Sequence, residues 1–472
     1  MLRLSFDLAV VGAGEAGIAA AVRASELGAR VALIEKSRQL GGACVATGTL
    51  PSKVLSLSAG MLEVVNKAKN FGIRVEGGFA LDFKEIQASR ARLARCDVGT
   101  IQSELRAHRV EVVRGAAAFV GERRLRVAAE DENASELEAR KVVVAAGSRP
   151  AEIHGLPADG RAVLTTDDFA GLGELPASIV IVGAGYVGCE YAFILRTLGL
   201  EVSLIEKLDH PLAGQDADIV SLIEKEMKRK GIRFFGGTTV TGRGEAEDGR
   251  LRLATDRGQE LVADMALVCA GRRPSTAGLN LDAAHVGAGP RGEILVDRRL
   301  ETTARGVYAA GDILGRAMLS STAILEGAVA AGNAMGEDRE LDERIIPTAI
   351  YTQPEIGSVG LTEDAARRAA IPYIKGVCPY AKLVKACAVS AHSSGLIKLI
   401  FEADSHRLLG AHILGTEAAE LIHAPALALK LGVTAEDLVY SVYHHPSFSE
   451  GFREAAAEAL RQKPGVRTAE KS

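Results

Sequence analysis

Residues 6–17 read FDLAVVGAGEAG, an apolar run that ends in a glycine loop of the form GxGxxG. Residues 18–27 then have apolar side chains at helical spacing, and a second apolar run over residues 30–34 ends at Glu35. This order is the pattern of a dinucleotide-binding βαβ unit, in which glycines and a helix N-terminus receive a pyrophosphate and the acid binds a ribose. The residues predicted to bind the dinucleotide here are Gly12, Gly14, Gly17 and Glu35.

The same pattern occurs a second time along the chain. Residues 179–182 form an apolar run, and residues 183–188 read GAGYVG. An acid, Glu206, follows the first glycine of this loop at the separation found between Gly12 and Glu35. Each copy closes with a strand and a turn that contains Gly, Arg and Pro, so one chain is expected to bind two dinucleotides. The second loop and the two closing turns add Gly183, Gly185, Gly188, Glu206, Gly147 and Gly271 to the predicted binding residues.

The composition limits the class of protein. With 472 residues the chain is long enough for about three domains that each bury a core. Apolar residues make up 47 % and charged residues 25 %, as in α/β enzymes, and a net charge of −4 gives no reason to expect nucleic acid. No apolar run has the length of a membrane span, so we expect a cytoplasmic protein. The six cysteines show no CxxC pair and no spacing typical of a metal site.

Residues 40–53, LGGACVATGTLPSK, resemble the active-site segment of the FAD-dependent pyridine nucleotide-disulfide oxidoreductases, the family of dihydrolipoamide dehydrogenase and glutathione reductase. The resemblance implies that Gly42 binds the cofactor. In most members two cysteines of this segment form a redox disulfide against the flavin, but here the two positions hold Cys44 and Thr49. Threonine forms neither a disulfide nor a thiolate, so electrons cannot leave through such a couple. Alternatively, Thr49 caps a helix expected to begin at Pro51.

A third motif, residues 303–312 with the sequence TARGVYAAGD, resembles the second flavin-binding segment of that family. The resemblance implies that Gly311 and Asp312 bind FAD, with the aspartate on the ribityl chain, and that the second glycine loop binds a nicotinamide nucleotide. Because a carboxylate at Glu206 would repel a 2′-phosphate, NAD(H) is expected to be preferred, with NADP(H) possible. The basic residues that could soften this preference are Lys207, Arg272 and Arg273.

Further residues match catalytic positions of the family. Lys53 resembles the lysine near flavin N5, where a positive charge stabilises the reduced flavin, and Glu190 resembles its ion-pair partner. His445 and Glu450 resemble the pair that reaches across a dimer interface as acid and base, which implies a homodimer. His445 is alternatively a retained interface contact, because the second thiol is missing. The predicted catalytic residues are therefore Cys44, Lys53, Glu190, His445 and Glu450, without a metal.

Residues 347–363 look like the opening of the family's interface domain. Within that domain, residues 395–401 and 408–414 are expected to be neighbouring strands, and residues 417–431 and 449–460 helices. The predicted fold is α/β, with two Rossmann-like dinucleotide-binding domains, for FAD and NAD(P), and a C-terminal α+β dimerisation domain. The predicted limits are 1–155 and 284–345 for the two parts of the FAD-binding domain, 156–283 for the NAD(P)-binding domain, 346–460 for the dimerisation domain and 461–472 for a disordered tail.

The leading interpretation is an FAD-dependent oxidoreductase that passes hydride from a nicotinamide nucleotide to a small-molecule acceptor other than a disulfide. Thr49 in GTLPSK and residues 346–352, IPTAIYT, resemble the soluble pyridine nucleotide transhydrogenases, in which a second NAD(P)+ is the acceptor. His445 and Glu206 depart from that pattern and favour a dihydrolipoamide dehydrogenase-like enzyme that reduces a quinone or another acceptor. A flavin-loaded structural subunit is a third alternative, against which the intact second glycine loop argues.

Overall fold

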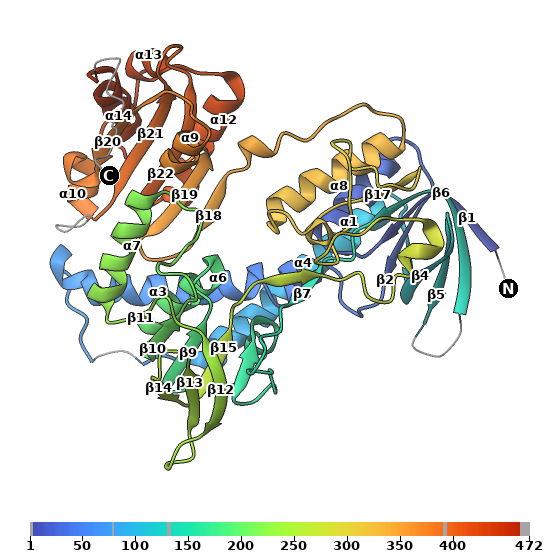
Figure 1. Ribbon diagram of the computed structural model, residues 1–472, viewed down its shortest axis with the longest axis horizontal. Helices are drawn as coiled ribbons and strands as arrows, with labels where there is room; N and C mark the ends of the chain where they lie inside the picture. Colours follow the sequence, from blue (N-terminus) through green and yellow to red (C-terminus); the bar gives the residue numbers. More distant parts are fainter. Residues whose placement is uncertain (1–2, 78–79, 130–133, 390–393, 463–472) are drawn as a thin grey trace. The chain divides into compact units, whose positions relative to one another are not determined.

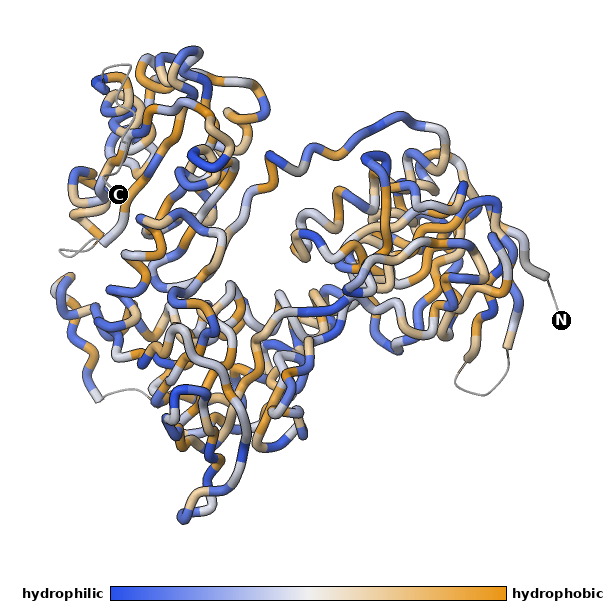
Figure 2. Tube along the Cα trace, in the orientation of Figure 1, coloured by the Kyte–Doolittle hydropathy of each residue, from blue (hydrophilic) through white to orange (hydrophobic). Residues whose placement is uncertain are grey.

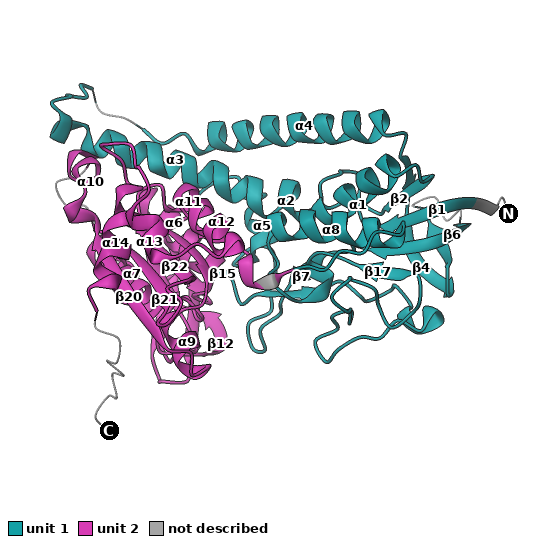
Figure 3. Cartoon of the chain, turned by 90° about the horizontal axis from the view of Figure 1, so that it is seen from above, with its two compact units in different colours: residues 1–176, 267–341 teal, residues 177–266, 342–472 magenta. Residues whose placement is uncertain are grey.

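The computed structural model describes residues 3–77, 80–129, 134–389 and 394–462 (Figure 1). The chain divides into two compact units, coloured separately in Figure 3. Unit 1 comprises residues 1–176 and 267–341, and unit 2 comprises residues 177–266 and 342–472. All but the first two residues of the predicted tail, 461–472, lie outside the described residues. The domain limits drawn from the sequence stay a prediction.

Unit 1 is built on a seven-stranded sheet in the order β3-β2-β1-β6-β5-β4, with β17 beside β6. Strands β3, β2, β1, β6 and β17 are parallel, and β5 and β4 extend the sheet antiparallel. Every residue of β2 is buried, as expected for a parallel strand with both faces covered, and Figure 2 colours the central strands mostly as hydrophobic. The bounds are β1 Arg3–Val11, β2 Val31–Glu35, β3 Glu111–Arg114, β4 Ala116–Gly121, β5 Arg124–Ala128, β6 Ala134–Val144 and β17 Val307–Ala309.

The helices of unit 1 follow strands of this sheet along the chain: α1 follows β1, α2 follows β2, and α8 comes after β17. Helix α1 begins at Glu15, directly after the N-cap Gly14, and therefore starts earlier than residues 18–27 suggested. Helix α8 packs closely on α1 because Gly327 lacks a Cβ, which would collide with the carbonyl oxygen of Ala16. Helices α3 and α4 lie side by side (Figure 3). The bounds are α1 Glu15–Glu26, α2 Gly42–Ala46, α3 Thr49–Lys67, α4 Phe83–Ala107 and α8 Ser320–Ala334.

Unit 2 begins with the second glycine loop. Strands β9, β10 and β11 are parallel neighbours, and α6 follows the loop directly, as α1 follows the first loop. A separate three-stranded antiparallel sheet, β12-β13-β14, follows in the chain. The bounds are β9 Ser178–Val182, α6 Tyr186–Thr197, β10 Glu201–Ile205, α7 Ala217–Lys230, β11 Arg233–Phe235, β12 Val240–Glu245, β13 Leu251–Thr255 and β14 Glu260–Ala263.

The C-terminal part of unit 2 is a five-stranded sheet, β18-β19-β22-β21-β20, on which α14 (Glu450–Leu460) packs against β20 and β21. The two strands predicted as neighbours are confirmed, since β21 and β22 pair antiparallel. The single helix predicted over residues 417–431 is wrong. Two helices, α11 and α12, stand there instead, because Pro425 has no N–H to bond the carbonyl of Leu421. The bounds are β18 Thr348–Ile350, β19 Glu355–Gly360, β20 Tyr373–Pro379, β21 Leu396–Glu402, β22 Leu408–Gly415, α11 Ala418–Leu421 and α12 His423–Leu431.

Within the ranges that the structure describes, no helix is both long enough and apolar enough to cross a membrane. In that same part of the chain, no three His, Cys, Asp or Glu side chains gather where they could hold a metal ion.

Candidate active site

The first glycine loop has the shape that a pyrophosphate requires. Gly12 has φ +104°, and a Cβ there would collide with the carbonyl oxygen of Ala145, while a Cβ on Gly17 would collide with that of Gly12. Gly14 caps α1 without a side-chain hydrogen bond, and a Cβ there would meet only the Cα of Gly42, at 3.9 Å. Two glycines thus leave space in front of the uncapped helix N-terminus, where an anionic dinucleotide fits.

The acids at the two strand ends make matching hydrogen bonds. The Oε2 atom of Glu35 accepts the N–H of Ala13 at 2.7 Å, and its Oε1 accepts the N–H of Ser37 at 2.7 Å. In unit 2, Glu206 accepts the N–H of Ala184 at 2.7 Å and, through Oε1, that of Leu208 at 3.1 Å. Each carboxylate is therefore fixed beside its glycine loop, where its remaining lone pairs can accept ribose hydroxyls.

The second loop repeats the open space of the first. Gly183 has φ +105°, and Gly185 caps α6 without a side-chain hydrogen bond. A Cβ on Gly185 would meet no atom within 4 Å, so the backbone there can be approached by a ligand. The residues of both loops fit a dinucleotide, in agreement with the repeat in the sequence.

Asp312 begins a short 3₁₀ turn (Asp312–Leu314) after Gly311, which has φ +81°. The N–H of Gly311 donates to Oε2 of the buried Glu326 at 2.7 Å, and the hydroxyl of Ser148 donates to Oδ2 of Asp312 at 2.5 Å. The guanidinium of Arg272 in turn donates to Ser148. Our sequence interpretation missed Ser148 and Glu326. The first of the repeated Gly-Arg-Pro turns, which contains Ser148, was the signal that could have pointed to this serine.

Arg272 contributes to this network instead of standing free near a nucleotide phosphate. Its Nη1 donates to Oδ1 of Asp167 at 3.1 Å, and its Nε and Nη2 donate to the hydroxyl and the carbonyl of Ser148. These bonds argue against the expectation that Arg272 softens the preference for NAD(H).

The segment that holds Cys44 folds as α2 and the start of α3. Thr49 is the first residue of α3 and Gly48 is the N-cap, with no side-chain capping bond, so the prediction that Thr49 caps the helix is wrong. The Thr49 hydroxyl lies instead 3.3 Å from the hydroxyl of Ser320, the first residue of α8. Pro51 is the third helical residue, where a missing N–H leaves no bond unmade.

Cys44 is held as a thiol. Burial raises the pKa of its Sγ, the hydrogen-bonded carboxylate of Glu15 raises it further, and hydrogen bonds from Ser320 and Thr49 only partly oppose the rise. A thiolate, which is the nucleophilic form, is therefore disfavoured at Cys44. All six cysteines of the chain are free, and Cys189 and Cys269 are buried, as their apolar surroundings in the sequence indicated.

Lys53 and Glu190 belong to different units, and their ion pair stays a prediction. Lys53 lies in the first turns of α3. Glu190 is buried in α6, where its Oε1 accepts the N–H of Tyr351 at 2.9 Å. This hydrogen bond fixes the glutamate relative to the segment that opens the C-terminal sheet.

His445 and Glu450 are brought together. The Nδ1 atom of His445 lies 3.0 Å from Oε1 of Glu450, and the imidazole is 65 % exposed. The N–H of Ser447 and the bond to His445 lower the pKa of Glu450, so that it is a carboxylate at neutral pH. Because a carboxylate only accepts, Nδ1 carries the proton of the neutral ring and Nε2 is left to exchange protons with a ligand.

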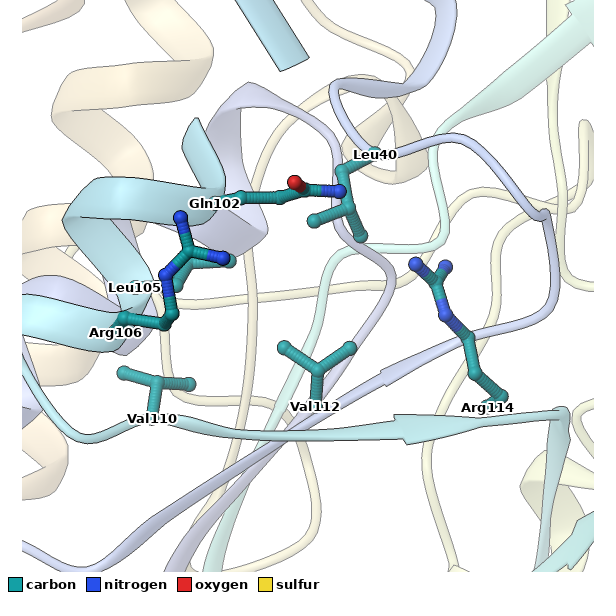
Figure 4. A pocket seen from close by; sticks show the side chains of 7 residues that line it. All are labelled: Leu40, Gln102, Leu105, Arg106, Val110, Val112 and Arg114. Atoms are coloured by element: carbon teal, nitrogen blue, oxygen red, sulfur yellow. The ribbon is translucent and has the colours of Figure 1, made fainter. Parts of the chain in front are cut away.

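A cavity of about 210 Å³ lies in unit 1, between α4 and β3 (Figure 4). It is lined by Leu40, Gln102, Leu105, Arg106, Val110, Val112 and Arg114. None of the predicted site residues lines it. Arg114 also donates to the carbonyl oxygen of Ser37 at 2.6 Å, which ties the end of β3 to the loop that follows Glu35.

Two glycine loops with paired acids, together with the Gly311–Asp312 segment, define an oxidoreductase that uses a flavin and a nicotinamide dinucleotide. A family model described as pyridine nucleotide-disulphide oxidoreductase matches residues 6–327, and the dimerisation domain of that family matches residues 346–456. The chain belongs to the pyridine nucleotide-disulphide oxidoreductase family. It is therefore an FAD-dependent NAD(P)H oxidoreductase that carries a dimerisation domain, and the predicted family and fold class are confirmed.

Similar proteins cover almost the whole chain. A dihydrolipoyl dehydrogenase of Thermus scotoductus is 35 % identical over 463 residues, with 97 % of this chain and 98 % of the relative covered. A soluble pyridine nucleotide transhydrogenase of Mycobacterium tuberculosis is 32 % identical over 460 residues, with 97 % of each covered. The solved structure of LpdA from Mycobacterium tuberculosis superimposes with a TM-score of 0.89 at 26 % identity, with 97 % of this chain and 99 % of that chain covered. The names of the first two relatives, a dihydrolipoyl dehydrogenase and a pyridine nucleotide transhydrogenase, indicate different substrates.

Proposed function

We propose that this enzyme passes hydride from NAD(P)H through FAD to an acceptor that is not a disulfide, and that a second NAD(P)+ is the leading acceptor. Thr49 is the observation that carries the proposal. Its hydroxyl pairs with Ser320 at 3.3 Å, and the Cys44 thiol beside it has a raised pKa. A dithiol couple needs two sulfurs and one ready thiolate, and this segment supplies neither.

The other predicted residues take the roles that the family gives to their positions. FAD, when bound, supplies the hydride chemistry, and the first glycine loop, Glu35, Gly42 and Asp312 hold it. The second glycine loop holds the nicotinamide nucleotide, and Lys53 with Glu190 places a positive charge near the flavin. The closing glycines Gly147 and Gly271 belong to the turns beside Asp312, since β7 and β16 pair there. We further propose a homodimer through the dimerisation domain.

We propose that NAD(H) is preferred over NADP(H). The support is the position of Glu206, whose carboxylate is fixed by backbone N–H groups of the second loop and of the residues that follow the strand. A 2′-phosphate bound there would meet a fixed negative charge.

A second candidate is a dihydrolipoamide dehydrogenase-like enzyme that reduces a quinone. The retained His445–Glu450 pair favours it, because reduction of a quinone by NADH to a quinol and NAD+ consumes one proton. Hydride transfer from NADH to NADP+ consumes none, so a transhydrogenase has no use for this acid and base. Lipoamide is not proposed as the acceptor, because Thr49 leaves this segment without the second sulfur of a dithiol couple.

Steady-state turnover of the flavin-loaded protein with NADH and three acceptors, thio-NAD+, a water-soluble quinone and lipoamide, tests these proposals. We expect turnover with thio-NAD+ and negligible turnover with lipoamide. Cys44→Ser is the matched control and should leave the thio-NAD+ rate unchanged. Lipoamide turnover that is abolished in Cys44→Ser would overturn the proposal, while turnover with the quinone alone would favour the second candidate.

A further inference from the structure

Three residues of unit 1 form a directed chain of hydrogen bonds that ends on Asp312. The Nε–H of Arg272 donates to Oγ of Ser148 at 2.8 Å, and the Ser148 hydroxyl donates to Oδ2 of Asp312 at 2.5 Å. The serine is acceptor towards one neighbour and donor towards the other, so each bond polarises and strengthens the next. The last bond ends on a charged carboxylate oxygen, and such charge-assisted hydrogen bonds are stronger than bonds between neutral groups.

A short antiparallel ribbon holds the first two members of this chain in place. Strand β7 (Ser148–Pro150) pairs with β16 (Arg272–Pro274), and the ribbon is closed by N–H···O bonds from Ser275 to Gly147 and from Ala151 to Gly271. Arg272 and Ser148 therefore lie on the two paired strands of one ribbon, which brings the arginine side chain close to the serine that it contacts.

The guanidinium of Arg272 is fixed at more than one edge. Besides the bond from Nε, its Nη2 donates to the carbonyl oxygen of Ser148 at 3.0 Å and its Nη1 donates to Asp167 at 3.1 Å. A planar fork with donors at set angles can make these three bonds together, and a lysine ammonium cannot. Asp167 in α5 (Thr166–Phe169) thus sets the direction in which Arg272 points.

The backbone that carries Asp312 is fixed independently. Gly311 has φ +81°, its N–H is bonded to the buried Glu326, and a Cβ on it would meet the Cβ of Ala16 at 3.0 Å. With the backbone set, the carboxylate direction is the remaining freedom of Asp312. Ser148 removes that freedom by occupying Oδ2, which leaves Oδ1 to accept a ligand hydroxyl.

We propose that Ser148 and Arg272 are positioning residues for FAD, which hold the Asp312 carboxylate in the direction that binds the ribityl chain. The inference rests on the proposed assignment of Asp312 to FAD. Under this proposal neither residue touches the cofactor, and both act through the Asp312 carboxylate.

The test is the rate at which FAD leaves the holoenzyme, followed by the rise of flavin fluorescence after dilution. Ser148→Ala and Arg272→Gln should each speed release about tenfold, the size expected for losing a hydrogen bond to a charged group. The double variant should release FAD no faster than the faster single variant, because both residues act through one chain. Ser148→Thr retains the hydroxyl and should release FAD at the wild-type rate. Arg273→Gln, an exposed neighbour on the same strand, is the charge-matched control.

The outcomes distinguish the positioning role of Ser148 and Arg272 from the assignment of Asp312 to FAD, on which that role rests. Asp312→Asn measured alongside should speed release at least as much as either positioning variant. If Ser148→Ala and Arg272→Gln behave like the wild type while Asp312→Asn releases FAD quickly, the positioning role is wrong and the aspartate assignment stands. If all three variants release FAD at the wild-type rate, the assignment of Asp312 itself is overturned. Release from Ser148→Thr as fast as from Ser148→Ala would mean that packing, not the hydrogen bond, is responsible, and would overturn the inference.

Discussion

The Oγ1 atom of Thr49 lies 3.3 Å from the Oγ atom of Ser320, so that the first residues of α3 and α8 meet through their hydroxyls. Both hydroxyls partly lower the pKa of the Cys44 thiol, which burial raises. A second sulfur at the threonine position would face the Cys44 thiol, and in this chain a hydroxyl pair stands in its place. The two hydroxyls satisfy one another and cannot be oxidised to a bond.

Thr49→Cys should create the missing couple. Because the Thr49 hydroxyl is close enough to Cys44 to lower the pKa of its thiol in part, we expect a sulfur at position 49 to lie within reach of a disulfide. We expect the air-oxidised, unfolded variant to show fewer reactive thiols than the six of the wild type, and the holoenzyme to consume a second equivalent of NADH. Thr49→Ser is the control, since it keeps the hydroxyl and adds no sulfur. Seven reactive thiols in the oxidised variant would contradict this arrangement.

Glu206→Gln should narrow the preference for NADH over NADPH. The substitution removes the negative charge but keeps an oxygen that can accept the N–H of Ala184. We expect the ratio of kcat/KM for the two nucleotides to fall about tenfold, which corresponds to about 1.4 kcal/mol. Glu201→Gln, an exposed glutamate at the start of the same strand, should leave the ratio unchanged. A wild type that prefers NADPH would show that the carboxylate does not face the ribose.

His445→Gln should distinguish acceptors by their need for a proton. Glutamine can still bond Glu450 but cannot exchange a proton, so turnover with a quinone should fall about a hundredfold, the usual size of acid–base assistance. Turnover with thio-NAD+ should stay the same, because hydride transfer between nucleotides needs no proton. Equal loss with both acceptors would mean that the histidine supports the dimer interface, and His444→Gln provides the neighbouring control.

Lys398 makes unit 2 sensitive to acid. Its side chain is 1 % exposed, and its Nζ donates to Asp216 at 2.8 Å, to Asp218 at 2.6 Å and to Glu363 at 2.7 Å. Burial alone would raise the pKa of Glu363, but hydrogen bonds from Lys375 and Lys398 outweigh it and lower the pKa to about 2. Since the carboxyl has an ordinary pKa of 4.5, its contribution to stability is present above that pH and is lost as the pH falls towards 2.

Lys398→Met should therefore lower the free energy of unfolding by about 3 kcal/mol at pH 7, because it removes the ammonium partner of the Asp216 carboxylate, which is 0 % exposed. The difference from the wild type should shrink as the pH falls from 4.5 through about 2, because the carboxyl of Glu363 becomes protonated in the wild type over this range. Urea denaturation across this pH range measures it. Arg252→Met, which removes an exposed ion pair with Glu260 elsewhere in unit 2, is the control and should cost less than about 1 kcal/mol at every pH. A difference that is constant with pH would contradict the assignment.

Val442→Glu should weaken the dimer. Val442 is 99 % exposed and Tyr440 85 % exposed in the segment that leads to His445, and large apolar side chains so exposed mark a surface that another chain covers. Light scattering at micromolar concentration should show monomers for the variant and dimers for the wild type. Leu295→Glu, at a 46 % exposed position of unit 1, should stay dimeric.

Much of the fold is already determined by contiguous sequence. A strand, a glycine loop and a helix are successive in the chain, so the separation of Gly12 from Glu35 and of Gly183 from Glu206 sufficed to predict both dinucleotide loops and the bonded acids. Local chemistry also explains the one failed helix, since Pro425 was visible in the sequence and its missing N–H divides residues 417–431. The replacement of a cysteine by Thr49 likewise needs no structure to exclude a disulfide.

Only the tertiary structure decided which side chains meet across long separations. Thr49 and Ser320 are 271 positions apart, and Ser148 is 164 positions from Asp312 and 124 from Arg272. Periodicity and motif spacing report the local backbone and cannot report such pairs, because a hydrogen bond depends on how distant strands and helices pack and on which rotamer that packing allows. The sequence determined the two dinucleotide-binding motifs and the missing sulfur, whereas packing decided that the hydroxyl of Thr49 lies beside that of Ser320 and that Arg272 bonds Ser148.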